Sequence, residues 1–85
     1  MPVTVRLPAP LREKAGTAEV TIDDPVHDIA SVWSAIARRF PTLARELADP
    51  IYNVAINDVI LLHGVGPHPV KDDDVIEIIP TIAGG

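Results

Sequence analysis

The chain has no cysteine, and this absence excludes several kinds of protein at once. A disulfide framework, a thiolate nucleophile and a cysteine metal site all require sulfur that the chain lacks. The longest stretch without a charged residue, 59–70, contains two glycines and two prolines and falls far short of the roughly 20 apolar residues that span a bilayer. Arg6 and Arg12 interrupt the only early apolar stretch, so no signal peptide is expected. We therefore expect a cytoplasmic protein without membrane contact.

The length and the charge limit the possibilities further. The 85 residues allow one small domain, and a hydrophobic share of 47% is too high for a disordered chain. The net charge of −5 divides into +1 over residues 1–45 and −6 over residues 46–85. The acidic half would repel nucleic acid, since phosphate binding needs clustered cations. A protein partner with a basic groove would complement it, although such a charge also serves solubility alone.

Apolar spacing predicts the secondary structure. Alternation with a period of two predicts strands at 2–7, 18–22, 52–56 and 75–79, with a short returning strand at 59–62. Apolar residues at steps of three and four predict a helix over 29–40, with Asp28 as its N-cap and Pro41 at its end. Residues 9–15 are expected to be a connection, and residues 43–48 one or two further helical turns. Asn57-Asp58 and residues 71–74 are expected to be turns.

The order strand, strand, helix and then two or three strands predicts the fold. We expect an α+β protein of the β-grasp type, with a mixed sheet of four to five strands covered by one main helix. Residues 1–79 would form the β-grasp domain, and residues 80–85 a flexible C-terminal tail.

Neither an enzyme active site nor a metal site is evident in the sequence. The three histidines (His27, His63 and His68) do not share one element at metal-ligand spacing. Three adjacent acids at residues 72–74 are more typical of a solvated turn than of a calcium loop. We therefore expect no metal, no bound cofactor and no catalytic side chain.

The last predicted strand offers a surface for a partner. If Ile76 and Ile78 face the helix, Val75 and Ile79 face outward together with Ala55. An exposed apolar patch rimmed by acids is typical of a partner site. The alternative is a strand that is buried on both faces.

The sequence ends in Gly84-Gly85. Two residues without Cβ can pass a narrow channel and bring a terminal carboxylate to another protein's active site. The carboxylate itself is inert, but an adenylate made from it with ATP is an electrophile. The simpler alternative is a frayed terminus without a role.

Over essentially its whole length the sequence resembles the MoaD/ThiS family of ubiquitin-like sulfur carriers. Its opening (residues 3–7), Leu11-Arg12-Glu13 and Ile56-Asn57 are similar to the family's pattern. The strongest likeness covers 70–85, where the family has a Leu-Lys-Asp-Gly-Asp turn, an apolar strand, proline and a terminal Gly-Gly. The sequence departs from the pattern where Asp73 replaces the turn glycine, Thr81 a second proline and Pro8 an aromatic residue.

The resemblance implies a function. An E1-like enzyme would use ATP to adenylate Gly85, and a sulfurtransferase would convert it to a thiocarboxylate. The thiocarboxylate would give its sulfur to an acceptor such as the large subunit of molybdopterin synthase. Gly84 and Gly85 carry over from the family, whereas the docking role of Ala55, Val75, Ile79 and Ile82 is an inference of our own. Sulfur donation for cysteine or another metabolite, protein modification through the same tail, and a plain interaction module remain open alternatives.

Overall fold

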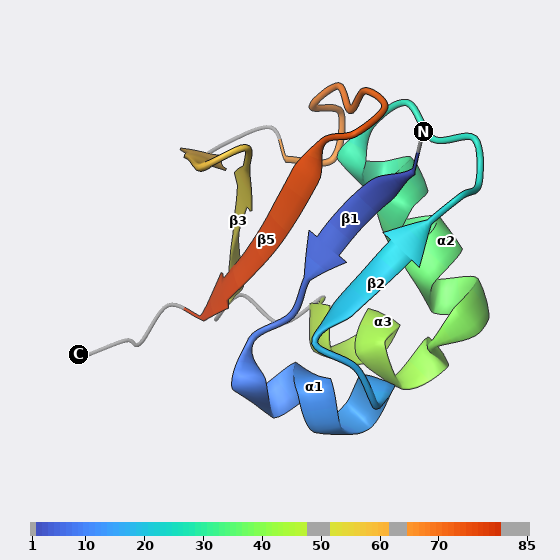
Figure 1. The fold of residues 1–85 in the computed structure, drawn as a ribbon, viewed down its shortest axis with the longest axis vertical. Coiled ribbons are helices and arrows are strands. Elements are labelled where there is room, and N and C mark those ends of the chain that lie inside the picture. Colours follow the sequence, from blue (N-terminus) through green and yellow to red (C-terminus); the bar gives the residue numbers. More distant parts are fainter. Residues whose placement is uncertain (1, 48–51, 62–64, 81–85) are drawn as a thin grey trace.

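Five strands form one mixed sheet in the computed structural model, which describes residues 2–47, 52–61 and 65–80 (Figure 1). In chain order the strands are β1 (Val3–Arg6), β2 (Glu19–Ile22), β3 (Tyr52–Ile56), β4 (Val59–Leu61) and β5 (Val75–Pro80). Across the sheet the order is β2-β1-β5-β3-β4. The central strand β5 runs parallel to β1 and antiparallel to β3. The predicted β-grasp architecture is confirmed, and β5 extends one residue beyond the strand that we expected.

The main helix, α2 (Ile29–Arg39), begins where the sequence predicts. Asp28 Oδ1 accepts a hydrogen bond from the Ser31 backbone N–H at 2.8 Å, and the Asp28 N–H donates to Ser31 Oγ at 3.1 Å. This reciprocal capping box satisfies donors that the first helical turn would otherwise leave free. The buried face of α2 consists of Ile29, Val32, Ala35 and Ile36.

The expectation of a connection before β2 is wrong, because residues 9–15 form a helix, α1 (Ala9–Ala15). Pro10 lies in the first turn, where a missing N–H costs no hydrogen bond. Leu11 is fully buried, and Gly16 ends the helix in the left-handed conformation, with φ 76°. The helical turns expected over residues 43–48 are found as α3 (Pro41–Leu47), which begins two residues earlier than expected and buries Leu43.

The core lies between the sheet and the helices. Ile76 and Ile78 of β5 are 0% and 2% exposed, and both belong to the cluster of buried apolar side chains that includes the inner face of α2. Val75 and Ile79 alternate with them and are only half-buried. The alternation that the sequence predicted for this strand is therefore confirmed.

Two turns place non-glycine residues in the left-handed region. Asn57 and Asp58, with φ values of 49° and 71°, join β3 to β4 in the backbone form that tight hairpins require. Asp73 has φ 68° in the turn before β5. Asparagine and aspartate tolerate this conformation better than other side chains, which explains how Asp73 can occupy the position of a turn glycine.

The capping box predicts a pH dependence of stability. The Ser31 N–H holds the pKa of Asp28 below its usual value of 3.8. A carboxyl with a lowered pKa contributes stability above its unfolded pKa, and this contribution is lost as the pH falls through the folded pKa. Asp28→Asn keeps a good cap but cannot titrate. The unfolding free energy of the wild type should therefore fall more steeply than that of Asp28→Asn below about pH 4.

Urea unfolding at a series of pH values measures this difference. Asp23→Asn is the matched control, because Asp23 is exposed and no hydrogen bond or ion pair of its side chain occurs among the described residues. Parallel pH profiles for the wild type and Asp28→Asn would contradict the prediction.

Candidate functional site

The sheet has one face toward the helices and one open face. Residues that are paired across neighbouring strands point to the same face of the sheet. The register therefore assigns each strand residue either to the face toward the helices or to the open face. Arg6 pairs with Glu19 on one side and with Glu77 on the other, and Ala55 pairs with both Glu77 and Ile60. These residues share the open face with Val75 and Ile79, which alternate with the buried positions of β5.

The predicted apolar patch lies on the expected side of the sheet, but not all of the predicted residues are exposed there. Val75 and Ile79 lie on the open face and are half-buried, whereas Ala55 is only 2% exposed. Its methyl group lies in register between Ile60 and Glu77, and both of these side chains are longer. The prediction that Ala55 is exposed is therefore wrong, although the residue does lie on the predicted face.

Ile60 was not expected on this face. Its side chain is 52% exposed on the edge strand β4, in register with Ala55. No alternation marks its direction, because Val59, Ile60 and Leu61 are all apolar. Ile60, Val75 and Ile79 together form the sheet patch. Glu77 lies among them on the same face. An apolar surface with a carboxylate at its centre suits a protein partner that presents apolar side chains and a cation.

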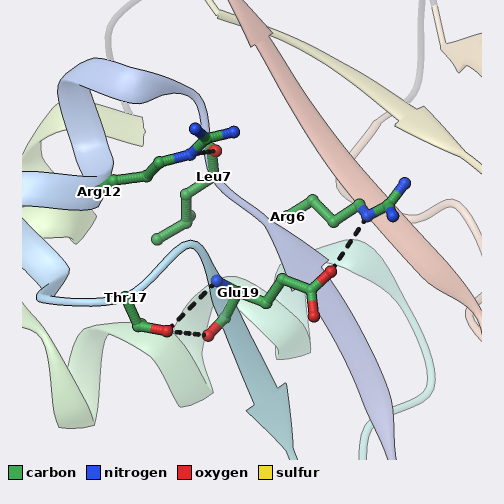
Figure 2. A network of polar contacts seen from close by, with 5 residues as sticks. All are labelled: Arg6, Leu7, Arg12, Thr17 and Glu19. Atoms are coloured by element: carbon green, nitrogen blue, oxygen red, sulfur yellow. Dashed lines mark hydrogen bonds and ion pairs between the residues drawn. The ribbon is translucent and has the colours of Figure 1, made fainter.

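Charged groups lie on the β1 side of the sheet patch, and Figure 2 shows two of them, Arg6 and Glu19. Arg6 Nε lies 3.2 Å from Glu19 Oε2, with both side chains more than half exposed. Such a pair contributes little to stability because water screens it. A hollow of about 400 Å³ lies along this border, and its lining includes Thr4, Arg6, Asn57, Val75 and Glu77.

Asn57 fixes the start of β5 beside this hollow. Its Oδ1 accepts from the Val75 N–H at 2.9 Å, and its Nδ2 donates to Asp74 Oδ1 at 2.9 Å. The other oxygen of Asp74 accepts from the Lys71 N–H at 2.8 Å. These bonds join the β3–β4 turn to the turn before β5, so Val75 is held in place on the open face.

The remaining sequence predictions for the site lie outside the described residues. Ile82, Gly84 and Gly85 follow Pro80, the last residue that the structure describes, and Pro80 is paired with Tyr52. The structure therefore fixes the position of Pro80, to which the C-terminal segment is joined.

Elsewhere in the described part of the chain the charged groups support the fold. Arg38 Nη2 donates to Asp24 Oδ2 at 2.7 Å, and this hydrogen bond lowers the pKa of Asp24. Lys14 pairs with Glu46 at 3.3 Å between α1 and α3. Among residues 2–47, 52–61 and 65–80 no group of three or more histidine or acidic side chains could hold a metal ion. Among the described residues, no helix combines the length and the apolar character needed to cross a bilayer.

Comparisons with known proteins show the family of the chain and support its fold. The sequence matches the ThiS family over residues 5–85. The structure is similar to a chain of the Amycolatopsis orientalis BexX/CysO complex, with 27% identity over 98% of this chain and 99% of that chain and a TM-score of 0.83. A comparison with curated protein sequences gives no match.

Two further structures share the fold over nearly their whole length. One is the small archaeal modifier protein 1 from Methanosarcina acetivorans, with 30% identity over 99% of this chain and 96% of that chain and a TM-score of 0.71. The other is a chain of the complex of subunits 1 and 2 of the molybdopterin-converting factor from Helicobacter pylori 26695, with 27% identity over 100% of both chains and a TM-score of 0.68.

The two faces of β5 predict opposite outcomes for neighbouring substitutions. Ile79→Glu places a carboxylate on the open face, where water reaches it, so the fold should survive. Ile78→Glu places the same group in the core, where an unpaired charge costs several kcal/mol, comparable to the whole stability of a small domain. Circular dichroism and thermal unfolding of both variants measure the difference. Equal destabilisation would contradict the assigned faces.

Proposed function

The chain belongs to the ThiS family of ubiquitin-like sulfur carriers, and from this premise we propose that it carries sulfur as a thiocarboxylate on Gly85 and donates it to molybdopterin biosynthesis. The observation that carries the proposal is the extent of the family match, which runs through Gly84-Gly85. The proposal takes Gly85 as the terminal residue of the protein in the cell.

The position of β5 supports this role. Its open-face residues Val75 and Ile79 belong to the sheet patch, and the same strand leads directly into the C-terminal segment after Pro80. An enzyme that docks on the sheet patch would therefore bind next to the start of the segment that it must receive. The two glycines at the end add no side chain that would obstruct a narrow channel.

The chemistry requires two steps on the Gly85 carboxylate. In the first, a carboxylate oxygen attacks the α-phosphorus of ATP, pyrophosphate leaves, and an acyl-adenylate forms. In the second, sulfur at the oxidation level of sulfide attacks the carbonyl carbon, AMP leaves, and a thiocarboxylate remains. The chain acts as a co-substrate in both steps. In this proposal an E1-like enzyme holds ATP, and the chain itself binds no cofactor.

The proposed acceptor is a molybdopterin synthase large subunit. The likeness to a chain of the Helicobacter pylori complex covers all of both chains, and that complex pairs two subunits of a molybdopterin-converting factor. The runner-up is another sulfur-accepting enzyme, which the likeness to a chain of the BexX/CysO complex supports. The acceptor that takes sulfur from the thiocarboxylated chain in a reconstituted reaction identifies the pathway.

Protein modification is a second candidate function. The likeness to the archaeal modifier protein, at 30% identity, favours it. In this case the activated Gly85 would form an isopeptide bond with a lysine of a target protein. No lysine or arginine follows Lys71, so trypsin would leave residues 72–85 attached to the target lysine. Branched peptides of this kind in a digest of the host proteome would establish modification, and their absence would leave sulfur transfer as the role of the tail.

Gly85→Ala tests the role of the tail. The added methyl group adjoins the reacting carboxyl, so adenylation by the host's E1-like enzyme should fall on the order of a hundredfold, as expected for a misplaced reacting group. Thermal unfolding should not change. The measurement is ATP–pyrophosphate exchange that depends on the added chain.

Gly66→Ala is the matched control for this substitution. A Cβ at Gly66 would meet nothing closer than Ala30 Cβ at 4.0 Å, so this variant should keep both its stability and its activity. Exchange that stays at the wild-type rate with Gly85→Ala would refute the proposed tail chemistry.

A further inference from the structure

A second hollow lies beside the end of β5. The β1 strand pairs with β5 only as far as Arg6 opposite Glu77, whereas β3 stays paired with β5 as far as Tyr52 opposite Pro80. The last three residues of β5 therefore have no strand partner on the β1 side. A hollow of about 380 Å³ occupies this side, and its lining includes Leu7, Pro8, Arg12, Ile79 and Pro80.

Arg12 is held at the α1 side of this hollow. Its Nε donates to the Leu7 carbonyl oxygen at 2.9 Å, which fixes one edge of the guanidinium (Figure 2). The two terminal nitrogens make no hydrogen bond or ion pair with the described part of the chain. A guanidinium whose Nε is occupied still presents these two nitrogens together, and they can donate side by side to one carboxylate.

The other charges of the hollow determine where an anion can bind. Arg6 is already paired with Glu19 and lies in register beside Glu77. The two carboxylates repel an anion from that side, whereas Arg12 attracts it. The hollow therefore accepts a negative group at its α1 side only.

We infer that Arg12 binds an acidic side chain of the activating enzyme and so positions the start of the tail during adenylation. This inference rests on the proposed function. Five residues follow Pro80, and an extended segment of that length spans about 17 Å. A nucleotide phosphate that reacts at the end of an extended tail is therefore remote from Arg12, and a carboxylate of the enzyme's docking surface is the anion that reaches it.

The test is chain-dependent ATP–pyrophosphate exchange by the host's E1-like enzyme, with the chain concentration varied. Arg12→Ala should raise KM for the chain about tenfold to a hundredfold, as expected for the loss of a charged hydrogen-bonded pair. Arg12→Lys keeps the positive charge but lacks the two adjacent N–H donors. Its KM should therefore lie between those of the wild type and Arg12→Ala. Arg45→Ala, an exposed arginine on α3, is the control of equal charge and should change KM less than about twofold.

The salt dependence of KM distinguishes two roles of Arg12. One is binding a carboxylate of the enzyme, and the other is a structural role of its hydrogen bond to the Leu7 carbonyl oxygen. If Arg12 binds a carboxylate, the difference between the wild type and Arg12→Ala shrinks as ionic strength rises from about 0.05 to about 0.5 M. A difference that does not depend on salt and accompanies a lower unfolding temperature would overturn the inference, as would equal KM values. Absence of exchange with the wild-type chain would overturn the proposed function, and this inference with it.

Discussion

The pairing of β5 between β1 and β3 is the constraint on which the rest of the structure depends. One strand of six residues contributes Ile76 and Ile78 to the core and Val75 and Ile79 to the open face, and it ends where the C-terminal segment begins. Because β5 runs parallel to β1, the chain must cross over between them, and α2 lies within this crossover. The alternation of one strand thus determines both the packing of the core and the side chains of the open face.

The open face combines apolar contact with charge. Glu77 lies among the residues of the sheet patch, with Arg6 beside it in register. A partner that covers this patch must supply a cation or leave the carboxylate without water, which is costly. Exposed pairs such as Arg6–Glu19 add little stability, because water screens them.

Much of this arrangement could be predicted from the sequence. The alternation of β5 and the cap at Asp28 follow from residue types at fixed spacing. The helix α1 could not be predicted, since two prolines at its start indicate a break and seven residues give too little periodicity. The burial of Ala55 depends on the lengths of its cross-strand neighbours, which only the register reveals. Ile60 was missed because β4 is apolar at every position. The family resemblance is confirmed, while the roles of Gly84 and Gly85 remain predictions.

Sulfur carried on Gly85 would be detected by the intact mass of the protein purified from its host, with fragmentation of the C-terminal peptide. We expect a fraction in which one oxygen is replaced by sulfur, localised to Gly85, and the size of this fraction should increase when acceptor enzymes are depleted. A terminus that remains a plain carboxylate after incubation with ATP, a sulfide donor and the host's E1-like enzyme would contradict this expectation.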